Sequence, residues 1–438
     1  MDPLVSRRAL LGALGAAAAT LAPGLAHGQT FAADDVPGIA RYRWKWLRAQ
    51  LVLQPGLLWF DTATFGPTLR AVLAHAYRQL EAQSLDFRQF ETQSGAGSPD
   101  ERAVLSAASR FFGADPGELV LTGGARAGLG LVATGLDLAA GDEVVVTLHD
   151  HAAAAYPWLA QAQRRGLRIV EVQEPAGDTS PEDIVRRFEA AMTPRTRVMC
   201  LAHVQDCDGT VMPVRELCAL ARSRSVFSVV DGALAPGQVD VRLLDLGCDA
   251  YATGVDRWLN GPLDAGLLYV RRDSQSLLWP VAPDRPDGWR AVDRFDAPAP
   301  AVTPDYAAAA RFGASTVSRR GATIAAMPIA FELQDAVGRT LIQQRIRELA
   351  ARLRSGLEAV TGLQVVTPAH SALNAGIVTV RAPGRDVGAV VDSLALEDRI
   401  VVARVRHGAG FDALRLSVHA SQDEDDVGRC VAAIQRRI

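Results

Sequence analysis

The feature that most limits the fold of this sequence is a repeated alternation of short β-branched apolar runs with longer segments of helical periodicity. In the longer segments apolar side chains recur about every 3.6 residues, the spacing of one helix face. Such alternation is typical of parallel strands joined by crossover helices. Seven runs have the length and composition of strands: residues 119–122, 143–147, 168–172, 198–204, 227–230, 250–253 and 265–271. The sequence therefore predicts an α/β fold with a mainly parallel seven-stranded sheet.

Two of the predicted helices have clear start signals. Residues 99–112 follow Ser98, residues 181–192 follow Ser180, and each segment begins with proline. A serine side chain accepts a hydrogen bond from a free N–H group of the first turn, and proline fits the first helical position. Asp183 stands three residues after Ser180, in a pattern that resembles a capping box. Both segments are therefore expected to begin as helices at the proline.

The first 29 residues have the pattern of a twin-arginine signal peptide. Arg7 and Arg8 precede an Ala/Leu-rich run at 9–22, and small residues surround Ala26. The run is too short and too weakly apolar for a stable membrane anchor. Cleavage is expected near residues 26–30, which would leave no membrane span. The pattern predicts export by the twin-arginine pathway to the periplasm or the medium.

Three further units are expected after the signal. Residues 30–60 form an N-terminal segment predicted to pack on a small domain, 61–310 form the large domain, and 311–438 form a smaller α+β C-terminal domain. A stretch rich in Pro, Asp and Arg at 273–304 predicts a long loop near the site. The small domain is expected to contain a helical region, four strands and a last helix, at 321–360, near Leu363, Gly376, Ile400 and Leu414, and at 424–437.

Charge and cysteine patterns narrow the choice of ligand. The formal net charge is −3, and acidic and basic residues are interleaved, so nucleic acid is not an expected partner. The five cysteines contain no CxxC pair, which indicates neither a zinc site nor a disulfide framework. No metal is therefore expected. Lys45 is the only lysine of the chain.

Two segments carry residues suited to an anionic ligand with an aromatic ring. The first, 119–130, reads LVLTGGARAGLG: a strand, then glycines, then a helix start whose free N–H groups attract anions. Gly124, Ala125 and Arg126 are its candidate contacts, although a glycine-rich turn without a ligand has the same pattern. In the second segment Asp231 ends an apolar strand, where α/β proteins place ligands. Its carboxylate could pair with a protonated ring nitrogen, or it could simply cap the next turn.

A third segment, residues 247–270, reads GCDAYATGVDRWLNGPLDAGLLYV. With the first two, in this order and spacing, it resembles the class V aminotransferases, a pyridoxal-phosphate-dependent family that includes cysteine desulfurases and isopenicillin N epimerase-like proteins. The resemblance implies the three-layer fold type I and a homodimer. The matching residues are Asp231, Gly232, Ala233, Trp258, Gly261, Pro262, Gly266, Leu268, Tyr269 and Val270.

The resemblance also implies roles for residues elsewhere in the chain. His151 is the candidate for stacking on the pyridine ring, and Gln205 is the candidate polar contact of the cofactor. Arg415 resembles the arginine that receives a substrate carboxylate, a role that suits the paired donors of a guanidinium. Thr316 is the candidate for a threonine that completes the pocket of the neighbouring subunit, and residues 60–67 resemble the loop at the mouth of the substrate site.

The sequence departs from the family pattern where the chemistry is most demanding. The family's His-Lys pair is Asp256 and Arg257 here. Covalent attachment of pyridoxal phosphate needs a neutral amine, whereas a guanidinium keeps its charge, so Arg257 cannot form that bond. A family threonine falls at Arg126, and a histidine or glutamine that contacts the ring oxygen falls at Leu234. These changes indicate a remodelled pocket, in which Arg126 and Arg257 could face one anion.

Three interpretations follow. The chain could be a pseudoenzyme that binds pyridoxal phosphate, pyridoxamine phosphate or another anionic ligand non-covalently, alone or as the non-catalytic partner of an active relative. It could be a lysine-independent enzyme in which His151, His149 or Asp256 handles protons. It could be an ordinary transaminase, epimerase or lyase that acts on an amino acid or amine, which would require Lys45 to reach the site.

Overall fold

The structure is a computed structural model that describes residues 31–89, 99–147, 149–172, 179–279, 321–407 and 410–438. The predicted signal peptide, Ser98 and Thr316 lie outside these residues, as does most of the predicted loop. The helices are α2 (Ala40–Gln50), α3 (Arg70–Leu85), α5 (Pro99–Phe112), α6 (Ala125–Gly135), α7 (Ala152–Arg165), α8 (Pro181–Ala191), α9 (Val214–Ser223), α10 (Leu243–Leu246), α12 (Gly321–Ile324), α13 (Met327–Val337), α14 (Arg339–Glu358), α15 (Val387–Glu397) and α16 (Glu424–Gln435). Short 3₁₀ helices lie at Ala33–Asp35, Pro116–Glu118, Arg272–Leu277 and Ser371–Leu373.

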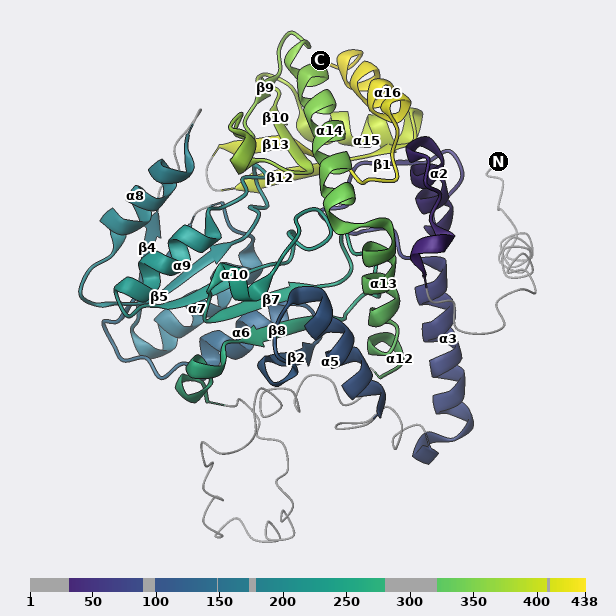
Figure 1. Ribbon diagram of the computed structural model, residues 1–438. Coiled ribbons are helices and arrows are strands. Elements are labelled where there is room, and N and C mark those ends of the chain that lie inside the picture. Colours follow the sequence, from purple (N-terminus) through teal and green to yellow (C-terminus); the bar gives the residue numbers. More distant parts are fainter. Residues whose placement is uncertain (1–30, 90–98, 148, 173–178, 280–320, 408–409) are drawn as a thin grey trace, which may run out of the picture.

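A seven-stranded sheet forms the centre of the large unit (Figure 1). Its spatial order is β2-β8-β7-β6-β5-β3-β4, and the five strands from β7 to β4 are parallel. β8 runs antiparallel to both of its neighbours. The strands are β2 (Leu119–Thr122), β3 (Glu143–Thr147), β4 (Arg168–Val172), β5 (Thr196–Ala202), β6 (Phe227–Asp231), β7 (Ala250–Gly254) and β8 (Gly266–Val270). The predicted α/β class and mainly parallel seven-stranded sheet are confirmed.

Helices cover both faces of this sheet, which makes three layers. Side chains of successive strand residues point to opposite faces. Along β3, Val144 and Val146 join a core cluster with Trp158 of α7, whereas Val145 joins the larger cluster on the other face. α6 and α7 therefore cover one face, and α8 and α9 contribute Phe188 and the rest of their apolar stripes to the other. Because both faces are buried, the strands read as continuous apolar runs.

A second, four-stranded sheet lies beside the C-terminal helices. Its order is β12-β13-β10-β9, all antiparallel, and α14, α15 and α16 pack around it (Figure 1). The strands are β9 (Gln364–Val365), β10 (Ile377–Arg381), β12 (Ala403–His407) and β13 (Phe411–Ser417). β1 (Leu58–Trp59) pairs in parallel with β11 (Ile400–Val401), which joins the N-terminal segment to this region.

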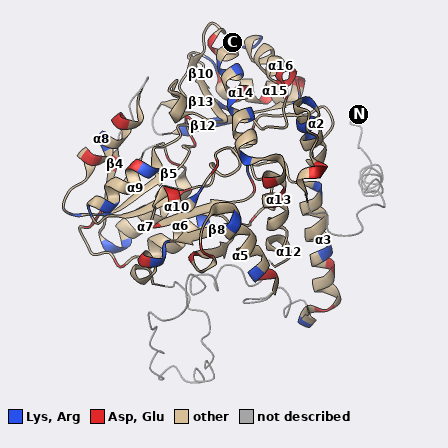
Figure 2. Ribbon diagram, viewed as in Figure 1, with Lys and Arg blue, Asp and Glu red and all other residues tan. Residues whose placement is uncertain are grey.

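The N-terminal helix α2 contacts the C-terminal helices through charged and aromatic groups. Arg48 forms an ion pair of 2.5 Å with the buried Asp426 of α16. The guanidinium of Arg345, on α14, lies 5.8 Å from the ring centre of Trp44. Acidic and basic residues occur on the same helices elsewhere, including α5 and α9 (Figure 2). Helix α2 thus contacts α14 and α16, and the four-part division of the chain stays a prediction.

Local signals predicted element starts better than strand ends. The capping box at α8 is present, with the Ser180 hydroxyl accepting from the Asp183 N–H at 3.2 Å. The strand expected at 198–204 is β5, Thr196–Ala202, because the chain leaves the sheet after Ala202 and turns back through a bridge between Val204 and Val211. The first residues of the expected loop at 273–304 form a 3₁₀ helix, Arg272–Leu277. β12 and α15 were not predicted as separate elements.

Candidate functional site

A cavity of about 980 Å³ opens at the carboxyl ends of the parallel strands, between the large sheet and β12. Parallel α/β sheets place their ligand sites at this edge, so the position of the cavity fits the topology of the large sheet. Its walls come from the β2–α6 junction, the strand ends of β3, β5 and β6, the β7–β8 connection and the loop at 60–67. Its polar and charged lining includes Thr64, Arg126, Thr147, Asp150, His151, Glu171, Asp206, Asp231, Asp256, Arg257, Asp264, Arg404, Arg406, His407 and Arg415.

The N-terminus of α6 forms one end of the cavity. Gly123, Gly124, Ala125 and Arg126 all line it. Gly124 has φ of 110°, a conformation that favours glycine, and a Cβ at this position would meet only open space. The exposed Arg126 side chain has no hydrogen-bond or ion-pair partner among the described residues. Free helix N–H groups and an unpaired guanidinium together make this end suitable for an anion such as a phosphate.

Two carboxylates lie at the floor of the cavity. Asp231 ends β6, is 5% exposed, and accepts a hydrogen bond of 2.9 Å from the N–H of Ala233. Asp150 is 6% exposed, and its Oδ1 accepts from the N–H of Ala202 at 3.2 Å. Its Oδ2 has no hydrogen-bond partner within the described part of the chain. Burial raises the pKa of Asp150 to about 7, with the charge of Asp231 as a further cause, and burial also raises the pKa of Asp231.

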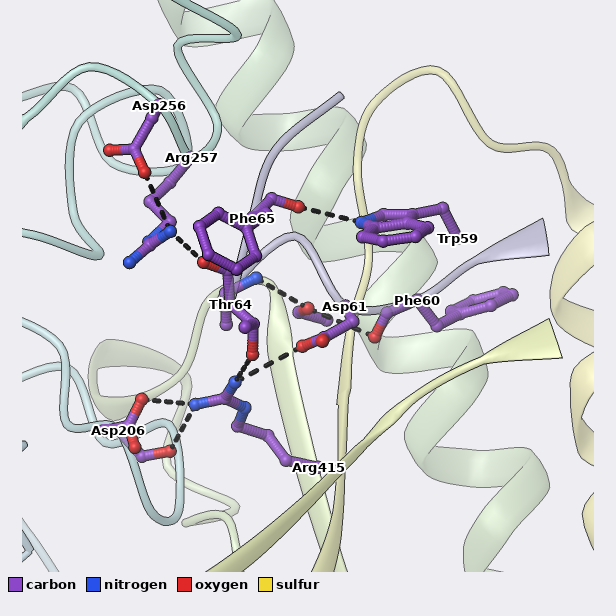
Figure 3. Close-up of polar contacts among 11 residues, drawn as sticks. Trp59, Phe60, Asp61, Thr64, Phe65, Asp206, Asp256, Arg257 and Arg415 are labelled. Carbon is purple, nitrogen blue, oxygen red and sulfur yellow. Dashed lines mark hydrogen bonds and ion pairs between the residues drawn. The ribbon is translucent and has the colours of Figure 1, made fainter. Parts of the chain in front are cut away.

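Arg257 holds the loop at the mouth of the cavity (Figure 3). Its Nη1 donates to the carbonyl oxygen of Thr64 and lies 2.8 Å from the Asp256 carboxylate. The guanidinium also lies 5.2 Å from the ring centre of Phe65, a cation–π contact. The N–H of Gly66 donates to the Asp256 carbonyl at 2.8 Å, and a Cβ on Gly66 would come within 1.8 Å of the Arg257 carbonyl oxygen. Arg257 therefore fixes the position of this loop at the mouth of the cavity.

Arg415 lies at another wall, within a buried polar network (Figure 3). Its residue exposure is 3%. One terminal nitrogen donates to the carboxylate and to the carbonyl oxygen of Asp206, and the other donates to the Thr64 hydroxyl at 2.6 Å and to Asp61 at 3.3 Å. Burial raises the pKa of Asp61, whereas the positive charge of Arg415 acts to lower it. Arg415, the candidate for receiving a substrate carboxylate, therefore donates its hydrogen bonds to acceptors of its own chain.

The remaining sequence candidates take different positions. His151 and Leu234 line the cavity. The His151 Nδ1 accepts from the N–H of Ala153 at 3.1 Å, so this histidine caps α7. Gln205 does not line the cavity; it is buried, and it donates to the Thr147 hydroxyl at 3.2 Å. Lys45 is exposed on α2 and is not among the residues that line the cavity.

Sequence reasoning missed Asp150 and Asp206, which the structure places in the cavity. Each stands next to a residue that was selected instead, His151 and Gln205 respectively. His149 does not line the cavity; its Nδ1 lies 3.0 Å from the carboxylate of Asp208. Asp150 lies three residues after β3 and Asp206 four residues after β5, whereas Asp231, which the sequence did identify, is the last residue of β6.

The described residues contain no group of three or more His, Cys, Asp and Glu side chains placed to hold a metal ion. Among them, no helix has both the length and the apolar character needed to cross a bilayer.

Comparison with known proteins establishes the family. The sequence matches the aminotransferase class-V family over residues 103–429. An isopenicillin N epimerase of Amycolatopsis lactamdurans is 30% identical over 409 residues, which are 90% of this chain and 98% of that protein. A cysteine desulfurase of Cronobacter sakazakii is 30% identical over 403 residues, 87% of this chain and 93% of that protein. The chain belongs to the class V aminotransferases, a pyridoxal-phosphate-dependent family, and the expected resemblance is confirmed.

Solved structures give the same fold. A C-DES variant with glycine covalently linked to its pyridoxal phosphate has a TM-score of 0.75 and 22% identity, over 89% of this chain and 99% of that one. The cysteine desulfurase CsdA of Escherichia coli also has a TM-score of 0.75, with 21% identity, over 90% of this chain and 98% of that one. These similarities confirm the type I fold that the sequence predicts.

The raised pKa of Asp150 predicts a dependence of stability on pH. Because this pKa is higher in the folded chain, near 7, than its ordinary value of 3.8, the contribution to stability is full below the ordinary value and is lost as pH rises through about 7. Asp150→Asn should remove that dependence, which is on the order of 2–4 kcal/mol between about pH 4 and about pH 8. Urea unfolding across this range measures it, with the exposed Asp137→Asn as control. Identical pH profiles for wild type and Asp150→Asn would contradict the assignment.

Proposed function

We propose that this chain binds pyridoxal phosphate or pyridoxamine phosphate non-covalently, as a pseudoenzyme or a lysine-independent variant of its family. The observation that carries the proposal is the position of Arg257. A charged guanidinium that donates to the Thr64 carbonyl and pairs with Asp256 cannot supply the neutral amine that covalent attachment requires. Lys45, the only lysine, does not line the cavity.

The residues that are present fit the rest of the cofactor. The N–H groups at the start of α6, with Gly124 open to the cavity and Arg126 unpaired among the described residues, suit a phosphate. The buried carboxylate of Asp231 suits a protonated ring nitrogen. When bound, the cofactor's ring withdraws electrons from the bonds of an attached amine. Another phosphorylated anion could use the same end of the cavity.

One observation favours a lysine-independent enzyme over a purely binding protein. Asp150 lines the cavity and forms no ion pair among the described residues, and its pKa near 7 lets its carboxyl both hold and release a proton at neutral pH, although its Oδ2 is enclosed by protein atoms. Asp256 pairs with Arg257, and the His151 Nδ1 accepts a backbone hydrogen bond, so each is more restricted in this role. Asp150 is therefore the strongest candidate for moving a proton to or from a ligand here.

Non-covalent binding of the cofactor predicts a specific spectroscopic result. Pyridoxal phosphate added to the mature protein should give an absorbance band that dialysis removes. Borohydride treatment followed by peptide mapping should find no labelled residue, because no amine lies in the cavity. Lys45→Arg should behave like wild type. Labelling at Lys45 would overturn the proposal and make that residue catalytic. The absence of any binding would leave only a pseudoenzyme that binds another anionic ligand.

The Arg257→Lys variant tests whether an amine at this position can attach the cofactor covalently. A lysine at 257 restores an amine to the family's position, so borohydride should then fix the cofactor to residue 257. Arg126→Lys, which also places a lysine in the cavity, is the control and should stay unlabelled. If a folded variant still binds the cofactor reversibly but is not labelled at residue 257, then the side chain at 257 does not reach the cofactor.

Export is proposed from residues 1–29, which lie outside the described residues. A substitution of both Arg7 and Arg8 by lysine should keep the protein in the cytoplasm, because the twin-arginine pathway reads that pair. Fractionation of the producing cells measures the effect. The same arginine-to-lysine changes at Arg41 and Arg43, on α2, should leave export intact. A periplasmic or secreted double variant would contradict this route.

The protein is also proposed to form a homodimer. α3 exposes Leu73 by 47%, Tyr77 by 69% and Leu80 by 49%, and this spacing places them on one helix face. Light scattering should give the mass of two copies, and Tyr77→Arg should shift the equilibrium to monomer. Leu396→Arg, at a position 83% exposed on α15, should not. A monomer that pairs only with a co-expressed active relative would instead support the partner-subunit interpretation.

A further inference from the structure

The guanidinium of Arg415 is saturated by acceptors from its own chain. A guanidinium has two N–H groups on each terminal nitrogen and one on Nε. Here each terminal nitrogen has two oxygen acceptors: two atoms of Asp206 on one side, and Thr64 and Asp61 on the other (Figure 3). Nε has no partner among the described residues, but it is enclosed by protein atoms. No pair of donors is left free to bind a second carboxylate.

Asp206 is the member of this network that faces the ligand space. It lines the cavity, and its side chain is 21% exposed, whereas that of Asp61 is 12% exposed and does not line it. The Asp206 carboxylate therefore stands where an incoming carboxylate would have to approach Arg415. Such a ligand must either displace a charged hydrogen bond or accept a like charge beside it, and both are unfavourable.

The rest of the cavity does not replace this lost carboxylate site. Arg257 is bonded to Thr64 and Asp256, and Arg404 pairs with Asp412 at 2.6 Å. The exposed Arg406 also lines the cavity, and its Nε lies 4.0 Å from the same Asp412 carboxylate. Arg126, at the other end, stands beside the N-terminus of α6, where the proposed function places the phosphate. A ligand whose phosphate occupies that end thus meets Asp206, rather than a free cation, at Arg415.

We infer that Asp206 is a specificity-determining residue, which fills the carboxylate site of Arg415 and selects ligands without a free carboxylate. The inference rests on the proposed function, because it describes the far end of the same phosphate-holding cavity. It assigns the ligand class as a pyridoxyl phosphate carrying an amine or neutral substituent, in place of an α-amino acid. The negative charge of Asp206 is the direct cause of the selection.

Two stable reduced compounds test this selection, phosphopyridoxyl-glycine and its neutral isostere phosphopyridoxyl-glycinamide. Wild type should bind the glycinamide compound at least as tightly as the glycine compound, measured by calorimetry. Asp206→Asn should shift the ratio of the two dissociation constants about 10- to 100-fold towards the glycine compound, the range of one charge-assisted contact. Asp206→Ala, which also opens space, serves if the amide of asparagine continues to occupy Arg415.

Glu171→Gln is the matched control. Glu171 is an exposed acid that lines the same cavity and has no contact with Arg415 among those recorded for the described residues. This variant should keep the wild-type ratio. Wild-type protein that prefers the glycine compound tenfold or more, or an unchanged ratio in folded Asp206→Asn and Asp206→Ala, would overturn the inference.

A second readout separates this inference from the proposed function. Acetate at constant ionic strength should raise the unfolding temperature of Asp206→Asn or Asp206→Ala, because a freed Arg415 can bind it, and should not raise that of wild type. If neither phosphopyridoxyl compound binds any form, the proposed function fails, and the acetate result still decides the role of Asp206. Equal effects of acetate on wild type and both variants would contradict that role.

Discussion

The buried guanidinium of Arg415 is the contact on which the arrangement of the cavity depends. It comes from β13 of the small sheet, yet its partners are Asp206, which follows β5 of the large sheet, and Asp61 and Thr64 of the mouth loop. A buried charge that loses a partner is strongly destabilising, so these three segments are held in one relative position. The cavity walls are thus fixed by electrostatics as well as by apolar packing.

A second arginine holds the same loop from the opposite side. Arg257 donates to the Thr64 carbonyl and Arg415 donates to the Thr64 hydroxyl, so both guanidinium groups bind this one residue. Gly66 completes the contact, because only a residue without Cβ can approach the Arg257 carbonyl so closely. One nitrogen, Nη1, makes both the carbonyl and the carboxylate contact, while the planar guanidinium also lies against the Phe65 ring, a contact that suits arginine.

The fold was more predictable from the sequence than the site. β2, β3 and β4 were predicted to the residue. β2 and β3 are buried at every position and read as apolar runs, whereas β4 is a partly exposed edge strand that its β-branched residues still identify. β12 was missed because its sequence, ARVRH, alternates arginine and histidine with apolar residues and lacks a buried run. Asp206 was missed for a different reason: its partner Arg415 lies 209 residues away in sequence, and no local pattern encodes that approach.

The charges of the cavity point to a ligand with one anionic end. At the α6 end, free N–H groups and Arg126 face the cavity without a compensating carboxylate contact among the described residues. At the Arg415 end, the cation is already matched by Asp61 and Asp206. Between them lie Asp150 and Asp231, whose raised pKa values reflect the cost of holding two carboxylates in a buried site. A ligand that brings a phosphate at one end, a protonated ring nitrogen in the middle and no carboxylate at the other end satisfies all three regions.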